Sequence, residues 1–253
     1  MNNTYNKIPN LKLSLSQSFH ESTKIRTVSK TIDENEWPES WKKIYFKGYP
    51  RFPEIVLPKP KLSQNISLKQ VLQQRHSFRD FSLKPLKVQD ISDLLFYSSN
   101  VRKYESSWSA NRFYPSAGSR YPLEVYPIIL NSEGIGSGVY HYYIKRHSLE
   151  VLVRNNFRRE LRGSFFSDWI NRSGILLFIS AVFPRTQAKY GVRGYRHILT
   201  EVGHLTQNLY LVATSLKLGC CSIGGYLDDK LNELLDLDGL EESIIGITAI
   251  GNK

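Results

Sequence analysis

The sequence predicts an α+β fold, with a mixed central sheet flanked by helices, and three observations lead to this prediction. Strand-like and helix-like segments alternate along the 253 residues, without the regular spacing of about 30 residues that repeated βαβ units give. An apolar run from Gly174 to Phe183 has the length of a strand that is buried on both faces. A long amphipathic segment follows between Lys189 and Leu218.

After its opening residues, Lys189 to Arg196, this segment reads as a largely buried helix. Its apolar residues recur at spacings of three and four, which is one stripe of a helix: Ile198, Val202, Leu205, Leu209, Val212 and Leu216. We expect the helix to stop near Gly219, where glycine accepts a positive φ. Titratable groups stand just before this helix, and so beside the core: Lys189, Tyr190, Arg193 and Arg196.

Residues 1–64 differ from the rest, and we expect them to form an arm that wraps the core or a partner subunit. Prolines interrupt the segment and leave little periodicity: Pro38, Pro50, Pro53, Pro58 and Pro60. Its aromatic residues need a surface to pack on, which argues against free disorder: Trp37, Trp41, Tyr45, Phe46, Tyr49 and Phe52. Residues 65–253 are expected to form the main domain.

The first half of the main domain opens with two helices and continues into strands. Ser67 and Gln70 form a capping-box pattern before one helix, and Val88 to Tyr97 is the next. Leu123 to Leu130 reads as a strand. A hairpin follows, with strands at 138–144 and 148–153.

The second half supplies one more helix before the central strand and three elements after the long helix. Asn156 is placed to cap a helix that contains Leu161, Phe165 and Trp169. After the long helix, Cys220 to Tyr226 is a strand end that breaks into a glycine-rich turn. The last two elements are a helix capped by Asp228 and a strand from Ile244 to Ile250 that closes the sheet.

Charge and cysteine content narrow the class of protein. The formal net charge is +11, but the basic residues are scattered, which favours a solvated or phosphate-binding role over nucleic-acid binding. Cys220 and Cys221 are adjacent and lack a Cys-x-x-Cys spacing, as in a reducing cytoplasm. Residues 1–21 show no apolar signal segment, and the run from Gly174 is too short to cross a bilayer. We therefore expect a cytoplasmic protein with no membrane partner.

Neither the histidines nor the closely spaced glycines form a recognisable ligand-binding motif. The six histidines show no metal-ligand spacing, and His197 and His204 are separated by two helical turns, roughly 10 Å, too far for joint chelation. No metal site is therefore predicted. Glycines at 134, 136 and 138 precede a strand, whereas a dinucleotide fingerprint joins a strand to a helix.

Arg75, Ser77 and Arg79 stand at alternate positions where the first helix ends in a loop. Two guanidinium groups and a hydroxyl in this spacing suit one phosphate or the polar edge of a flavin. An exposed basic turn would have the same composition, and the spacing alone does not choose between the two.

The order of several such segments resembles the nitroreductase superfamily and, more closely, its SagB-type dehydrogenases, which oxidise azolines to azoles in ribosomal peptide natural products. The resemblance runs from about Phe19 to Gly251 and rests on these segments: 19–24, 49–53, Arg75 to Phe81, Pro115 to Glu124, 138–142, Lys189 to Gly191, Gly203 with His204, Gln207 with Asn208, and Ile223 to Gly225. It implies a nitroreductase-like fold, a homodimer, and FMN bound at the two-fold interface.

The resemblance also implies roles for individual residues. One chain holds the FMN phosphate and ribityl chain, and its partner approaches with a loop. The implied cofactor-binding residues are Arg75, His76, Ser77 and Arg79; Pro115, Ser116, Ala117 and Gly118 from the partner; Ile223, Gly224 and Gly225 near flavin N5; and Lys253, which Asn252 separates from the closing glycine.

Lys189 and Tyr190 match the pair to which the resemblance assigns removal of a carbon-bound proton while a hydride passes to N5 and electrons go on to oxygen. Free lysine and tyrosine side chains have pKa values near ~10.4 and ~10, so both are poor bases unless perturbed. Burial beside Arg193, Arg196 and a flavin is expected to lower the lysine pKa.

Two other functions fit the same residues. A general nitroreductase or quinone reductase would take electrons from NAD(P)H. A flavin-binding scaffold subunit of a peptide-modifying complex would need no turnover. The expected partners are a peptide substrate and cyclodehydratase subunits, which the basic surface and aromatic arm suit.

Overall fold

The computed structural model describes residues 14–27, 33–42, 45–62, 66–104 and 110–253. Residues Met1–Trp37 and Pro38–Lys253 form two compact units. In the first unit, helix α1 (Leu15–Ser22) begins at a capping box, in which Ser14 accepts from the Gln17 N–H, and the short turn η2 spans Glu34–Glu36. The first thirteen residues of the expected arm lie outside the described residues.

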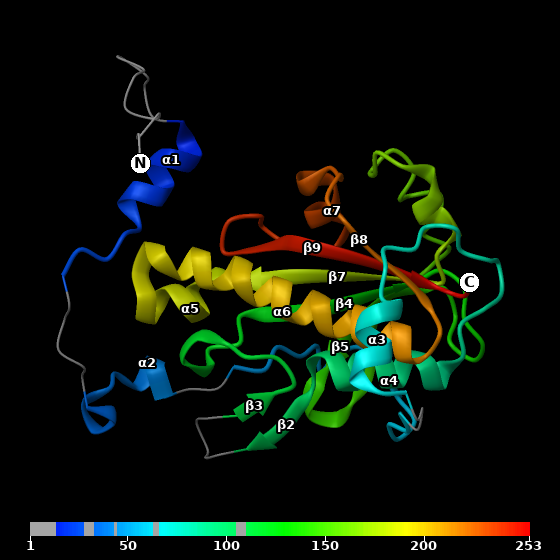
Figure 1. Cartoon of the computed structure of the whole chain (residues 1–253), viewed down its shortest axis with the longest axis horizontal. Coiled ribbons are helices and arrows are strands. Elements are labelled where there is room, and N and C mark those ends of the chain that lie inside the picture. Colours follow the sequence, from blue (N-terminus) through cyan, green and yellow to red (C-terminus); the bar gives the residue numbers. More distant parts are fainter. Residues whose placement is uncertain (1–13, 28–32, 43–44, 63–65, 105–109) are drawn as a thin grey trace. The chain divides into compact units, whose positions relative to one another are not determined.

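A seven-stranded sheet, in the order β1-β6-β5-β4-β7-β9-β8, organises the second unit (Figure 1). Each neighbouring pair of these strands is antiparallel. The strands are β1 (Glu54–Val56), β4 (Leu123–Ile129), β5 (Gly138–Tyr143), β6 (Ser148–Arg154), β7 (Ile175–Val182), β8 (Gly219–Ile223) and β9 (Glu242–Gly251). A small second sheet pairs β2 (Val101–Tyr104) with β3 (Ala110–Arg112). The α+β class, the hairpin and the buried strand at 175–182 are confirmed.

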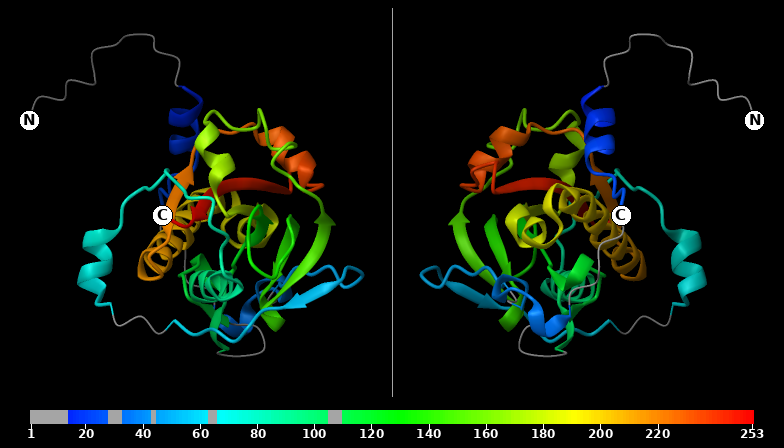
Figure 2. Two further views of the ribbon diagram at one scale, coloured as in Figure 1. Left: turned by 90° about the vertical axis from the view of Figure 1, so that its right-hand side faces the viewer. Right: turned by 90° about the vertical axis from the view of Figure 1, so that its left-hand side faces the viewer.

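Helices cover both faces of the sheet (Figure 2). The helices of this unit are α2 (Glu39–Lys42), α3 (Leu68–Gln74), α4 (Val88–Ser99), α5 (Phe183–Tyr190), α6 (Gly194–Ser215) and α7 (Asp228–Leu234). α4 and α6 pack on the face that receives Leu177 and Ile179 of β7. α7 and residues 157–170 pack on the face that receives Leu176 and Phe178. Alternation along β7 therefore divides the core in two.

α6 carries the predicted apolar stripe, and Ile198, Leu205 and Leu209 are at most 1% exposed. Its end differs from the prediction. Lys217, not Gly219, takes the positive φ, at 62°. Gly219 begins β8, where a Cβ would lie 2.3 Å from Phe78. The glycine is needed for close packing and not for the helix cap.

The prediction of a helix after Asn156 is wrong. Residues 157–163 form turns, and only a 3-10 helix, η5 (Asp168–Arg172), follows. Gly163 lies at φ 68°, a left-handed conformation that no α-helix continues through.

The last two elements differ from the prediction in smaller ways. Asp228 does not cap α7, because Leu227 is the N-cap. Asp228 lies in the first turn, where its negative charge interacts favourably with the helix dipole. β9 lies inside the sheet, and β8 is the edge strand beside it.

Part of the segment expected as an arm belongs to the sheet. β1 pairs with β6 at Ile55 and Leu149. Just before it, the Tyr49 N–H donates to Glu150 Oε1 at 2.7 Å, and Glu150 Oε2 lies 2.7 Å from His141 Nδ1. Burial lowers the pKa of His141, but bonds to Glu124 and Glu150 outweigh it and raise the pKa overall. The wrapping of a partner by residues 1–64 stays a prediction.

Within the described ranges, no helix combines the length and the apolar character that crossing a membrane requires.

Candidate functional site

Residues 75–82 run beside the edge strand β8. α3 starts at the predicted capping box of Ser67 and Gln70 and ends at Gln74, and Arg75 is extended. The Phe78 N–H then donates to Cys220 O at 2.9 Å. Gly219 allows this approach, because a side chain there would collide with Phe78. The basic segment is therefore held against the sheet by its backbone.

Three cations gather around this segment, each over an aromatic ring. The Arg75 guanidinium lies 5.4 Å from the Tyr210 ring centroid. Lys253 Nζ lies 5.5 Å from that of Phe78, and the Arg79 guanidinium 5.9 Å from that of Trp169. His76 is exposed, with Nδ1 2.8 Å from Gln74 O. The structure thus brings Lys253 to the Arg75–Arg79 segment despite the intervening Asn252.

β8 ends at Ile223, and the glycine pair follows. A Cβ on Gly225 would lie 2.6 Å from the Phe166 ring, whereas a Cβ on Gly224 would meet nothing within 4 Å. Phe165 and Tyr226 form an isolated antiparallel bridge just beyond. Gly224 is exposed, and its backbone is open to a ligand.

The loop of Pro115 to Gly118 lies against α6, where Glu201 holds it. The Ser116 hydroxyl donates to Glu201 Oε2 at 2.6 Å. Ser116 Oγ in turn accepts the Tyr121 N–H at 2.9 Å. Gly118 takes φ 58°, a conformation that favours glycine.

Gly118 also faces Lys189 and Tyr190, at the end of α5. α5 stops at Tyr190 because Gly191 follows with φ 53°. A Cβ on Gly118 would lie 2.5 Å from Tyr190 Oη and 3.3 Å from Lys189 Nζ. Lys189 Nζ also lies 5.2 Å from the Trp41 ring centroid. The predicted pair and the predicted loop thus meet within one chain.

Burial sets the protonation of the groups around Tyr190. Burial raises the pKa of Tyr190, and the positive charge of Arg120 offsets only part of this rise. The phenol therefore keeps its proton at neutral pH. The His197 ring packs edge-on against Tyr190, with centroids 4.9 Å apart. Burial, helped by Arg193, lowers the pKa of His197. Arg120 is therefore the cation that lowers the pKa of Tyr190. The effect that the sequence analysis expected from Arg193 and Arg196 concerns Lys189 and stays a prediction.

Glu201 is the site residue that the sequence analysis missed. It is 1% exposed, and burial raises its pKa to about 8. Among the described residues, its Oε1 has no hydrogen-bond partner. The positive charge of Arg112, which is 5% exposed, lowers the pKa of Glu201 only in part. The missed signal was an acid placed between Ile198 and Leu205, on the apolar stripe of the helix.

The predicted site residues form two groups along α6. Arg75 and Ser77 meet α6 at Tyr210, whereas Ser116 meets it at Glu201. Nine residues of helix separate these positions, about 14 Å at 1.5 Å per residue. A cavity of about 270 Å³ lies beside the second group, lined by Pro115, Ser116, Ala117, His197, Thr200, Glu201 and His204.

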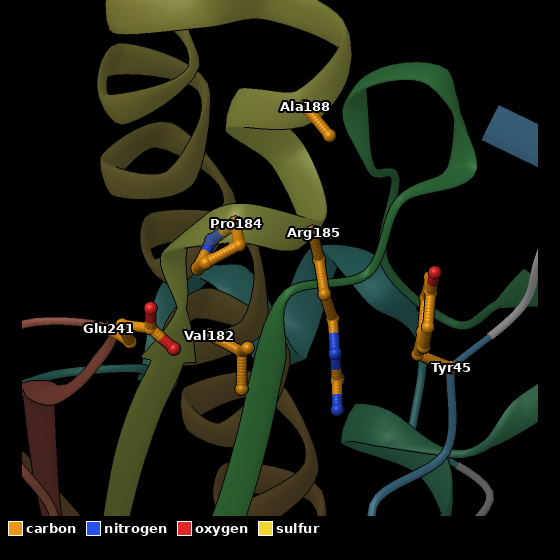
Figure 3. A pocket seen from close by; sticks show the side chains of 6 residues that line it. All are labelled: Tyr45, Val182, Pro184, Arg185, Ala188 and Glu241. Atoms are coloured by element: carbon orange, nitrogen blue, oxygen red, sulfur yellow. The ribbon is translucent and has the colours of Figure 1, made fainter. Parts of the chain in front are cut away.

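A larger cavity, of about 410 Å³, opens beside α5 (Figure 3). Its wall is mostly apolar, with two charged side chains: Tyr45, Val182, Pro184, Arg185, Ala188 and Glu241. Arg185 Nη1 pairs with Glu124 at 2.5 Å, and its guanidinium lies 6.0 Å from the Tyr45 ring centroid. The volume is in the range of ligand sites.

In the part of the chain that the structure describes, no three His, Cys, Asp or Glu side chains are placed to hold a metal ion. The charged groups suit an anion and a proton transfer instead.

Comparison with known proteins identifies the fold. The family model described as "Nitroreductase family" matches residues 72–252. A crystal structure from Anabaena variabilis, a nitroreductase by name, superposes with a TM-score of 0.73 at 28% identity. The match covers 94% of this chain and 46% of that one.

Two curated relatives carry informative names. MJ1384 of Methanocaldococcus jannaschii, a nitroreductase by name, is 36% identical over 73% of this chain and 90% of its own length. The microcin B17-processing protein McbC of Escherichia coli is 34% identical over 51% of this chain and 50% of its own. The chain thus spans about half the length of McbC.

Proposed function

The chain belongs to the nitroreductase family, and from this we propose that it is an FMN-dependent dehydrogenase of the SagB type. Its substrate would be a thiazoline or oxazoline ring in a ribosomally made peptide, which it oxidises to an azole as a homodimer. The observation that carries the proposal is the placement of Lys189 and Tyr190 against Gly118, in the loop whose Pro115, Ser116 and Ala117 line a cavity of about 270 Å³.

FMN is the cofactor of this family, and the residues present fit it. Its phosphate is a dianion, and Arg75, Arg79 and Lys253 supply cations around one short segment, with the Ser77 hydroxyl beside them. Gly224 leaves its backbone open at the end of β8. Bound there, FMN would supply the hydride acceptor for the oxidation, and oxygen would be the final acceptor of the two electrons.

The chain's own task is to move a proton. An azoline becomes aromatic by losing a carbon-bound proton and a hydride. Lys189, whose Nζ lies 5.2 Å from the Trp41 ring centroid and 5.9 Å from that of Tyr190, is the base in this proposal. Tyr190 keeps its phenol proton, because burial raises its pKa, and donates a hydrogen bond that orients the ring or the amine.

A peptide substrate is supported by the relative McbC, which is named as a microcin-processing protein. The cavity beside α5 offers a mostly apolar wall that includes Ala188, the residue before Lys189, and a side chain flanking the azoline would fit there. A cyclodehydratase that makes azolines is the partner that this reaction requires, because it supplies the substrate.

The test is to incubate the purified yellow protein with a thiazoline-containing peptide and oxygen, and to follow the loss of two hydrogen atoms by mass spectrometry. We expect oxidation by the wild type and about 100-fold less by Lys189→Ala and Tyr190→Phe, with FMN retained. Lys217→Ala, an exposed lysine elsewhere, is the matched control. Full activity in both site variants would remove these roles.

A reductase is the second candidate, favoured by the name of MJ1384. The two functions differ in where the flavin obtains its electrons. Rapid bleaching of the yellow protein by NADPH, with no change in an azoline peptide, would decide for the reductase.

A further inference from the structure

Tyr210 joins the two segments expected to hold the cofactor, although no sequence motif drew attention to it. It lies on α6 and is 8% exposed. The Ser222 N–H, on edge strand β8, donates to Tyr210 Oη at 2.8 Å. Ser77 Oγ lies 3.1 Å from the same oxygen. The ring of Tyr210 also carries the Arg75 guanidinium.

The direction of these hydrogen bonds follows from which groups must donate. A backbone N–H only donates, so Tyr210 Oη is the acceptor from Ser222. The phenol proton then needs an acceptor of its own, and Ser77 Oγ is in place to take it. The opposite order would make Oη accept twice and leave the phenol proton unused in a nearly buried side chain, which costs free energy.

This arrangement sets the direction of the Ser77 hydroxyl. Its oxygen accepts from Tyr210, so its own proton points away from Tyr210. Ser77 is exposed, so its own proton is available to a ligand. Donors in such a chain polarise one another, which strengthens the last hydrogen bond.

We propose that Tyr210 is a positioning residue of the cofactor site, which fixes Ser77 as a hydrogen-bond donor to an oxygen of FMN and aligns Arg75 beside it. This role rests on the FMN binding of the proposed function. Tyr210 does not touch the reacting atoms, and it acts through Ser77 and Arg75.

The test measures how tightly FMN is held by full-length protein, from the flavin fluorescence released on dilution. Tyr210→Phe keeps the ring under Arg75 and removes only the hydroxyl. We expect its FMN dissociation constant to rise about 5- to 10-fold, because without the Tyr210 hydroxyl Ser77 is no longer fixed as a donor to FMN and part of one hydrogen bond is lost. Ser77→Ala should have a similar effect. The double variant should be little weaker than either single one, because both break the same chain.

Tyr140→Phe is the matched control, because it also loses a buried phenol hydrogen bond, to Gly136 O at 2.7 Å. We expect it to bind FMN as the wild type does, with a comparable fall in Tm. Wild-type binding by Tyr210→Phe, or effects of Tyr210→Phe and Ser77→Ala that multiply, would overturn the role of Tyr210. Should Tyr210→Phe not fold, Ser77→Ala with unchanged FMN binding would overturn it equally.

Failure here differs from failure of the proposed function. A wild type that binds FMN and oxidises an azoline, with a Tyr210→Phe variant equal to it, removes only the role of Tyr210. A wild type that holds no FMN removes both.

Discussion

The backbone of Gly118 lies so close to the Tyr190 hydroxyl that a Cβ on the glycine would come within 2.5 Å of it. Real Cβ atoms do not approach an oxygen so closely, so any side chain at 118 must displace Tyr190 or the loop. The contact ties the loop of Pro115 to Gly118 to the Lys189–Tyr190 pair. The loop and the Lys189–Tyr190 pair therefore move together relative to the cofactor.

We predict that Gly118→Ala lowers azoline oxidation at least about 10-fold, because it moves Tyr190 away from its working position. Gly163→Ala is the matched control: Gly163 also has a positive φ, at 68°, but a Cβ there meets nothing within 4 Å. Both variants should lose about 1 kcal/mol of stability from the left-handed backbone. Equal turnover by the two, at equal Tm, would show that the contact with Tyr190 is without consequence.

Tyr190 should affect the rate in the same way across the neutral and mildly alkaline range. Burial raises the pKa of Tyr190 above its ordinary value of about 10, so the phenol stays protonated at every pH below that value. The ratio of wild-type to Tyr190→Phe rates is therefore predicted to stay constant between pH 6 and pH 9, on the order of 100-fold. The measurement is a pair of pH profiles at saturating substrate. A ratio that rises with pH in this window would mean that the phenolate acts as the base.

Glu201 should make stability fall as pH rises. Its pKa is raised from 4.5 to about 8, so between these values the folded chain holds a proton that the unfolded chain has lost. The contribution is most favourable below pH 4.5, declines up to about pH 8 and is level above it. Urea unfolding of wild type and Glu201→Gln at several pH values isolates it. We expect the variant to gain on the order of a few kcal/mol relative to wild type across this window, and a constant difference would contradict the buried, protonated acid.

Mixed dimers should test which chain supplies which residues. The resemblance takes the loop of Pro115 to Gly118 from the partner, and Lys189 lies with that loop. A dimer of one Arg75→Ala chain and one Lys189→Ala chain then has one intact site of two. Random mixing of two inactive homodimers is predicted to restore about a quarter of the wild-type activity. No recovery, with mixed dimers demonstrated by mass, would place both residues of a site in one chain.

Much of the fold follows from the sequence, because periodicity reports burial directly. The stripe from Ile198 to Leu216 and the apolar run at 175–182 needed only the geometry of a helix and a strand. The helix expected after Asn156 failed because Gly163 adopts a left-handed φ, which the sequence permits without requiring. The edge position of β8 was not predicted either, because it depends on the pairing of β8 with β9, which no local sequence pattern records.

The sequence by itself determined the types of residue in the site: cations around Ser77, a glycine in the loop at 118, and a lysine beside a tyrosine. The tertiary structure decided which of them meet. It set Gly118 against Tyr190, Ser116 against Glu201, and Tyr210 between Ser77 and Ser222. Such contacts join residues far apart in the chain, so their distances and protonation depend on how α6 packs on the sheet, which no local pattern records.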